Sequence, residues 1–114
     1  MANFNLQTGD QYDHLMIEGQ LTGGVETDEF VSTIEITEKN NKDIIVDFSN
    51  CTFISSIVIG FLLKKHIKFG EINKRFIVAG LNSTLESVFK MTKMNTILYI
   101  EPDFEAAKKY LLHK

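Results

Sequence analysis

The chain lacks the features that mark secreted and membrane proteins. Its 114 residues include one cysteine, one proline and no tryptophan. The single cysteine, Cys51, excludes an intramolecular disulfide and is compatible with a reducing compartment. No charged segment followed by an apolar stretch opens the chain. The longest apolar run, 57–63, is far shorter than the roughly 20 residues that span a bilayer. We therefore expect a cytoplasmic protein without membrane insertion.

The chain also has no excess of basic residues, no phosphate-binding glycine motif and no metal-ligand motif. Twelve lysines and arginines face fifteen acidic residues, giving a net charge of −3, which argues against a general nucleic-acid binder. No glycine-rich phosphate loop or dinucleotide fingerprint occurs. The histidines, His14, His66 and His113, are scattered and form no zinc-binding pair. These absences predict a protein without cofactor or metal.

The serines of the chain lack the surroundings of a hydrolase nucleophile. In the motif G-x-S-x-G the serine lies between two glycines, but Ile54 and Val58 occupy those positions around Ser56. Cys51 has no partner in a CxxC motif. We predict that the protein is not an enzyme. Catalysis by Ser56 or Cys51 stays open as a third function, which a substrate or nucleotide bound to the purified protein would favour.

Alternating strands and helices are what the sequence does contain. An initial hairpin is followed by three helix–strand units and a last helix, an order that favours an α/β sheet with parallel central strands. We predict one domain over residues 1–114, with a mixed four- to five-stranded sheet and about four helices. Strands are predicted around residues 4–6, 12–18, 43–48, 75–80 and 97–100, and helices begin near Thr27, Ser56, Ser83 and Pro102.

Three local patterns refine these helices. Ser83-Thr84-Leu85-Glu86 matches a capping box, so the third helix is expected to start there. Pro102 suits the first turn of the last helix, where a missing N–H is tolerated. Gly60 inside the second helix costs about 1 kcal/mol relative to alanine and predicts close approach by another backbone.

The run from Asp47 to Gly60 carries the functional signal. A buried strand ends in it, and after a short connection Ser55 and Ser56 open an apolar helix. A helix N-terminus presents unpaired N–H groups and a partial positive charge, so it favours a nearby phosphate. Two interpretations remain open at this point. Either Ser55 caps the helix and Ser56 is its first residue, or a serine here is a phosphorylation switch.

Most of the chain resembles a STAS domain, the family shared by anti-sigma factor antagonists and the cytoplasmic tails of sulfate transporters. Residues 55–60 stand where the family usually reads Asp-Ser-(Ser/Thr/Ala)-Gly-(Leu/Ile)-Gly, and 17–21 resemble the end of its second strand. Three departures occur: Ser55 replaces the aspartate before the serine, Val58 replaces a glycine, and Thr22 replaces the aspartate that closes the second strand. The remaining similar segments are 45–49, 52–54, 76–81, 88–89 and 94–95.

The resemblance implies a function by partner switching. The phosphorylated serine of the family falls on Ser56, with the adjacent Ser55 as the alternative. The unphosphorylated protein would bind an anti-sigma factor that is also a serine kinase, and this binding would free the sigma factor. Phosphorylation of the serine would break the complex, and a cognate phosphatase would remove the phosphate and allow binding again. A monomer or weak dimer is implied. The expected partner-binding residues are Gln20, Thr22, Ser55, Ser56, Ile57 and Val58.

A second function fits the same resemblance. The protein would then be an unphosphorylated STAS scaffold or adaptor in a signalling or transport complex. The departures at Ser55 and Val58 support this alternative, because they alter the segment that holds the switch serine.

Overall fold

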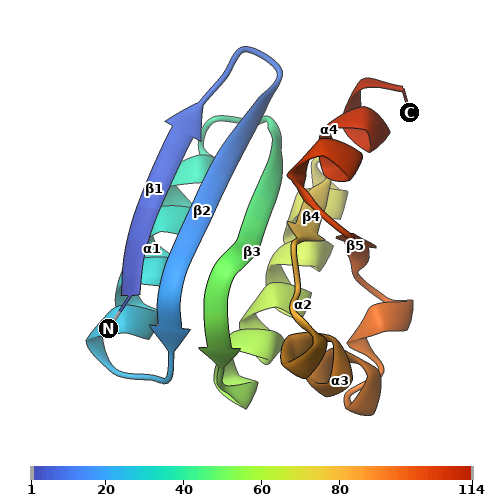
Figure 1. Cartoon of the computed structure of the whole chain (residues 1–114). Coiled ribbons are helices and arrows are strands. Elements are labelled where there is room, and N and C mark those ends of the chain that lie inside the picture. The colour runs from blue at the N-terminus through green and yellow to red at the C-terminus, as the bar shows by residue number, and fades with distance from the viewer. Residues whose placement is uncertain (1, 114) are drawn as a thin grey trace.

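The computed structural model describes residues 2–113, which form a five-stranded sheet with helices on both faces (Figure 1). The strands lie in sequence order across the sheet. β1 is antiparallel to β2, and β2 to β5 are mutually parallel. This confirms the predicted mixed α/β sheet. The elements are β1 Ala2–Thr8, β2 Tyr12–Leu21, α1 Val25–Glu38, β3 Asp43–Ile54, α2 Ser56–Glu71, β4 Phe76–Ala79, α3 Ser83–Met91, a 3-10 turn Met94–Thr96, β5 Tyr99–Glu101 and α4 Phe104–Leu112.

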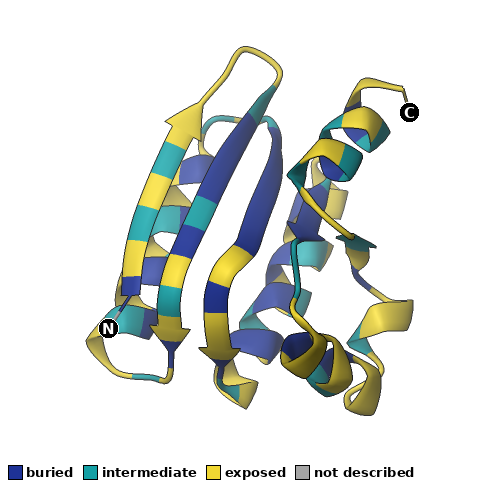
Figure 2. Ribbon diagram, viewed as in Figure 1, coloured by how far each residue is buried: buried dark blue, intermediate teal, exposed yellow. Residues whose placement is uncertain are grey.

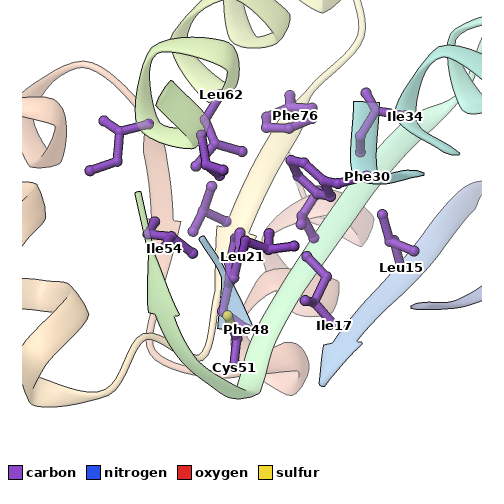
Figure 3. Packing of buried hydrophobic residues seen from close by; sticks show 14 of the residues in the cluster. Leu15, Ile17, Leu21, Phe30, Ile34, Phe48, Cys51, Ile54, Leu62 and Phe76 are labelled. Carbon is purple, nitrogen blue, oxygen red and sulfur yellow. The ribbon is translucent and has the colours of Figure 1, made fainter. Parts of the chain in front are cut away.

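Side chains of the central strands alternate between two apolar layers. Ile44 and Val46 of β3 point to the face that α1 and α2 cover, whereas Ile45 points to the face that α4 covers. The larger layer centres on Phe30 of α1, whose ring lies 6.5 Å from Phe48 of β3 (Figure 3). The first half of β3 is buried on both faces, and for this reason its apolar residues are continuous and do not alternate with polar ones.

One face of the sheet is open beside β1 and the second half of β2. Figure 1 shows α1 and α2 behind the sheet and α4 in front of it, on the side of β4 and β5. Phe104 of α4 also stacks on His14, so the start of β2 is covered. In Figure 2 exposed positions of β1 alternate with half-buried ones, whereas β2 is mostly buried in its first half and exposed in part toward its end. Asn3, Asn5 and Glu18 are exposed on this open face. The uncovered half is therefore polar, as its solvation requires.

β2 and β3 run further than the sequence predicts. β2 is predicted to end at residue 18 but ends at Leu21, and β3 is predicted to end at residue 48 but ends at Ile54. The two strands keep pairing beyond the predicted ends. Two register shifts, opposite Met16–Glu18 and Gly19–Gln20, each add one residue to β3. Such bulges bend the strand and let the hydrogen-bonded ladder continue across polar residues. The polar residues 49–52 therefore belong to the strand, although their polarity suggests a loop.

The predicted helix details are partly wrong. α3 is capped by Asn82, whose side-chain oxygen accepts from the Leu85 N–H at 2.8 Å, so the cap lies one residue before the expected box. Pro102 precedes α4, because Asp103 is the cap and the helix begins at Phe104. Gly60 is exposed, and a Cβ added to it would meet no atom of the described residues within 4 Å, so none of their backbone approaches it closely.

Candidate functional site

The ends of β2 and β3 bring the two predicted parts of the site together. The Ser55 N–H donates to the Leu21 carbonyl at 2.9 Å, which ties the start of α2 to the end of β2. Thr22 follows Leu21 directly, and Gln20 pairs with Phe53 in the ladder. The loop after β2 and the serine segment are thus neighbours at the carboxyl edge of the parallel strands, where α/β proteins usually place their binding residues.

A carboxylate holds the bulged part of β3 in shape. Asp47 Oδ1 accepts from the backbone N–H and the hydroxyl of Ser49, at 3.0 and 2.6 Å. Its other oxygen lies 3.1 Å from His14 Nε2. Burial alone would raise the pKa of Asp47, but the hydrogen bonds from His14 and Ser49 outweigh it and hold the pKa below its ordinary value. The carboxylate is therefore charged, and it fixes the strand ahead of the serine segment.

The loop that follows β4 closes against this carboxylate. Gly80 has φ +77°, a conformation that favours glycine. A Cβ at this position would lie 2.4 Å from Ser49 Oγ and 2.9 Å from Asp47 Oδ1. The Asn82 side chain nearby donates to the Cys51 carbonyl at 3.4 Å. The α3 start is thereby fastened to β3 beside the serine segment.

The N-terminus of α2 is unlike those of the other helices in residues 2–113. Ser55 is its N-cap in an extended conformation, but the hydroxyl makes no capping hydrogen bond. Ser55 Oγ is shielded from solvent and has no partner among the described residues. The first turn holds no acidic residue, whereas α1, α3 and α4 each have at least one. The first turn of α2 itself thus supplies no negative side chain at the positive end of the helix dipole.

The structure places five of the six expected partner-binding residues at the surface or its edge. Gln20, Thr22 and Ser56 are exposed, Ile57 is 70% exposed, and Ser55 is half-buried. Val58 is fully buried and belongs to the core. Its side chain packs inward because it lies in the first turns of an amphipathic helix. The expected partner-binding residues at the surface are therefore five, without Val58.

The position of Val58 explains why the segment needs no glycine where the family usually has one. The residue lies inside α2, and it is not among the described non-glycine residues with positive φ. A right-handed helical backbone suits valine, so no glycine is needed at this position. The departure changes a core side chain and leaves the backbone that presents Ser56 intact.

Sequence reasoning missed Phe53 and Asn82. Phe53 is 43% exposed and lies beside Gln20 in the ladder. Its exposure follows from the second bulge, which no sequence pattern announces. Asn82 carried a usable signal, because asparagine directly before a helical apolar pattern is a favoured N-cap. Phe53 and Ile57 are thus exposed apolar side chains within three residues of Ser56 in the sequence.

Two groups that could serve catalysis, His66 and Cys51, are unfavourably placed or protonated. His66 lies ten residues after Ser56 on the same helix, about 15 Å away along its axis. Its ring instead packs on Tyr99, with centroids 5.3 Å apart. Cys51 is buried, and burial raises the pKa of its thiol, so the reactive thiolate is disfavoured. Residues 2–113 contain no group of three or more metal-ligating side chains.

Comparison with known families identifies the fold. The model of the STAS domain family matches residues 8–107. The chain belongs to the STAS domain family. The match covers the β2, β3 and α2 segments that form the carboxyl edge described above. No curated protein sequence matches the chain at a significant level. None of the helices described in residues 2–113 has the length and hydrophobicity to cross a bilayer.

Solved structures agree with this STAS fold. The unphosphorylated form of the anti-sigma factor antagonist SpoIIAA superposes with a TM-score of 0.75 at 16% identity, over 98% of this chain and 100% of that one. A Thermotoga maritima protein proposed to be an anti-sigma factor antagonist gives 0.82 at 18%, over 96% and 95%. The phosphorylated form of SpoIIAA, a Bacillus cell fate determinant, gives 0.71 at 17%, over 95% and 99%. At these identities the likeness establishes the fold.

Proposed function

We propose that this STAS domain is an anti-sigma factor antagonist that regulates transcription by partner switching. In this proposal it binds an anti-sigma factor kinase through the surface formed by Gln20, Thr22, Ser55, Ser56 and Ile57. The observation that carries the proposal is the N-terminus of α2, where exposed Ser56 opens a helix with neither a side-chain cap among the described residues nor an acidic first turn. The likeness to both forms of SpoIIAA supports it.

Phosphorylation of Ser56 would act on binding and leave the fold unchanged. The phosphate adds about −1.5 to −2 charge at pH 7. At the uncapped end of α2 this charge is favourable by roughly 0.3–1 kcal/mol, so the phosphorylated protein stays folded. At a partner surface the same group must lose water next to Phe53 and Ile57, which are 43% and 70% exposed in the free protein. The complex therefore weakens, and the kinase returns to the sigma factor.

The test uses paired variants of the switch serine. Ser56→Asp is expected to keep its unfolding free energy and lose at least about tenfold in affinity for the cognate kinase, or about 1.4 kcal/mol. Ser56→Ala is expected to bind at least as tightly as wild type and to take up no phosphate from the kinase with ATP. The control is Ser87→Asp, which adds the same charge on an exposed position of α3. Equal affinity of wild type, Ser56→Asp and Ser56→Ala would refute the switch.

A scaffold without phosphorylation is the second candidate. It is favoured by the absence of a carboxylate directly before Ser56, since Ser55 supplies only a shielded hydroxyl. The apolar pair Phe53 and Ile57 would bind a partner without any phosphate. Intact-mass measurement of the protein from its native cell separates the two functions. One phosphate mapped to Ser56 under some growth condition supports switching, and its absence under all conditions supports the scaffold.

A further inference from the structure

The two edges of the sheet differ in how they are protected. β5 is three residues long and follows a 3-10 turn, so it offers little backbone for pairing. β1 has seven residues, Ala2–Thr8, and contains no charged residue and no proline. On the side away from β2, its backbone groups have no strand next to them within residues 2–113. Natural proteins usually block an edge of this kind with charge, proline or brevity, and β1 uses none of these devices.

The side chains of β1 are symmetric in polarity about Asn5. Asn3, Asn5 and Gln7 are exposed on the open face, whereas Phe4 and Leu6 are half-buried against the core. If a second β1 pairs antiparallel about a twofold axis at Asn5, amides stand opposite amides and Phe4 stands opposite Leu6. No like charges meet along the strand. Such cross-strand pairs are favourable, and the sequence of β1 is therefore complementary to itself.

Helix α1 beside this edge is also complementary to a second copy. Val25, Asp28 and Glu29 lie next to the first half of β1, around a surface hollow of about 590 Å³. The far end of α1 leads to Lys39 and Lys42, and the Lys42 ammonium donates to the Gly9 carbonyl just after β1. The last turn of α1 itself has no basic residue, so the positive charge at this end comes from the two lysines that follow the helix. A twofold axis at Asn5 brings these lysines of one copy toward Asp28 and Glu29 of the other, where opposite charges attract.

We propose that two copies of this protein associate through β1, joining their sheets into one continuous ten-stranded sheet about a twofold axis at Asn5. The bonds across the axis are backbone hydrogen bonds between the two β1 strands. The interface is separate from Ser56, since β3 and α2 lie beyond β2 in the strand order. Phosphorylation at Ser56 therefore leaves this association unchanged.

The experiment is sedimentation of the full chain over a concentration series up to roughly 1 mM, the range of weak association. Wild type is expected to show a monomer–dimer equilibrium. Asn5→Lys and Asn5→Asp each put two like charges on the axis and are expected to weaken the dimer at least tenfold. An equimolar mixture of the two variants is expected to restore association. Asn50→Lys, which adds a charge on the same open face at β3, is the matched control and is expected to dimerise like wild type.

Three results would overturn the proposal. The first is a wild-type protein that stays monomeric over the whole series, which would leave β1 as an edge without a second copy. The second is an Asn5→Lys variant that dimerises as tightly as wild type, which would put the interface elsewhere. The third is a mixture of the two charge variants that fails to associate although each variant has the wild-type circular dichroism spectrum.

Discussion

At the scale of the residue, the Ser55 hydroxyl is the unexpected feature. Serine is a favoured N-cap, and its position and backbone conformation are those of a cap. The hydroxyl nevertheless bonds to no described residue and is shielded from solvent. An unpaired buried hydroxyl contributes nothing to stability and costs part of its hydration. The residue is therefore held in place by its backbone bond to Leu21, and its side chain is dispensable for stability.

This difference between caps can be measured. Ser55→Ala is expected to change the unfolding free energy by less than about 0.5 kcal/mol, because no capping bond is lost. Asn82→Ala is expected to cost about 1 kcal/mol, because it removes the bond to the Leu85 N–H. Urea denaturation of both variants checks the pair. A loss of about 1 kcal/mol or more for Ser55→Ala would show that its hydroxyl caps α2.

At the scale of the element, the connection from β4 to α3 depends on Gly80. Gly80→Ala is expected to destabilise the protein by about 1–3 kcal/mol, because alanine is strained at positive φ and its Cβ meets Ser49 and Asp47. Gly60→Ala is the matched control. It lies inside α2 with open space around it, so alanine is expected to stabilise by up to about 1 kcal/mol. Equal effects of the two substitutions in urea denaturation would contradict this account.

The elements also show how far sequence reasoning reaches. The order and type of every strand and α-helix were predictable, because apolar periodicity reports which face is buried. The length of β3 was not, since Ser49, Asn50 and Thr52 have a polar pattern and stay in the ladder only through bulges. The position of Ser56 at the start of α2 was predictable from the strand-to-helix junction, whereas its phosphorylation stays a prediction. Phe53 and the burial of Val58 were not, because both depend on the packing of neighbouring elements.

At the scale of the whole molecule, the two apolar layers are unequal. The layer under α1 and α2 includes five fully buried phenylalanines, among them Phe30, Phe48 and Phe69. Within residues 2–113, the layer under α4 has five buried residues and no buried phenylalanine, and Ala107 and Leu111 are the helix's buried contribution to it. Since stability follows buried apolar area, α4 is expected to open more readily than α2, which lies on the larger layer.

Hydrogen exchange tests this ranking of helices. The amides of α4 are expected to exchange through local opening, with protection about tenfold or more below that of α2 and β3. Leu111→Ala is expected to lower the protection of α4 and leave that of α2 nearly unchanged. Equal protection of α4 and α2 under native conditions would mean that both layers open together.

The order of strands in the sheet has a kinetic consequence. Each strand lies beside the strand that precedes it in the chain, so every pairing joins neighbouring segments. Short sequence separations reduce the entropy lost in closing each loop and speed folding. The sheet can therefore grow strand by strand as the chain leaves the ribosome, from the β1–β2 hairpin onward. α4 is made after the strands that it covers, so their surface stays exposed until α4 has been synthesised.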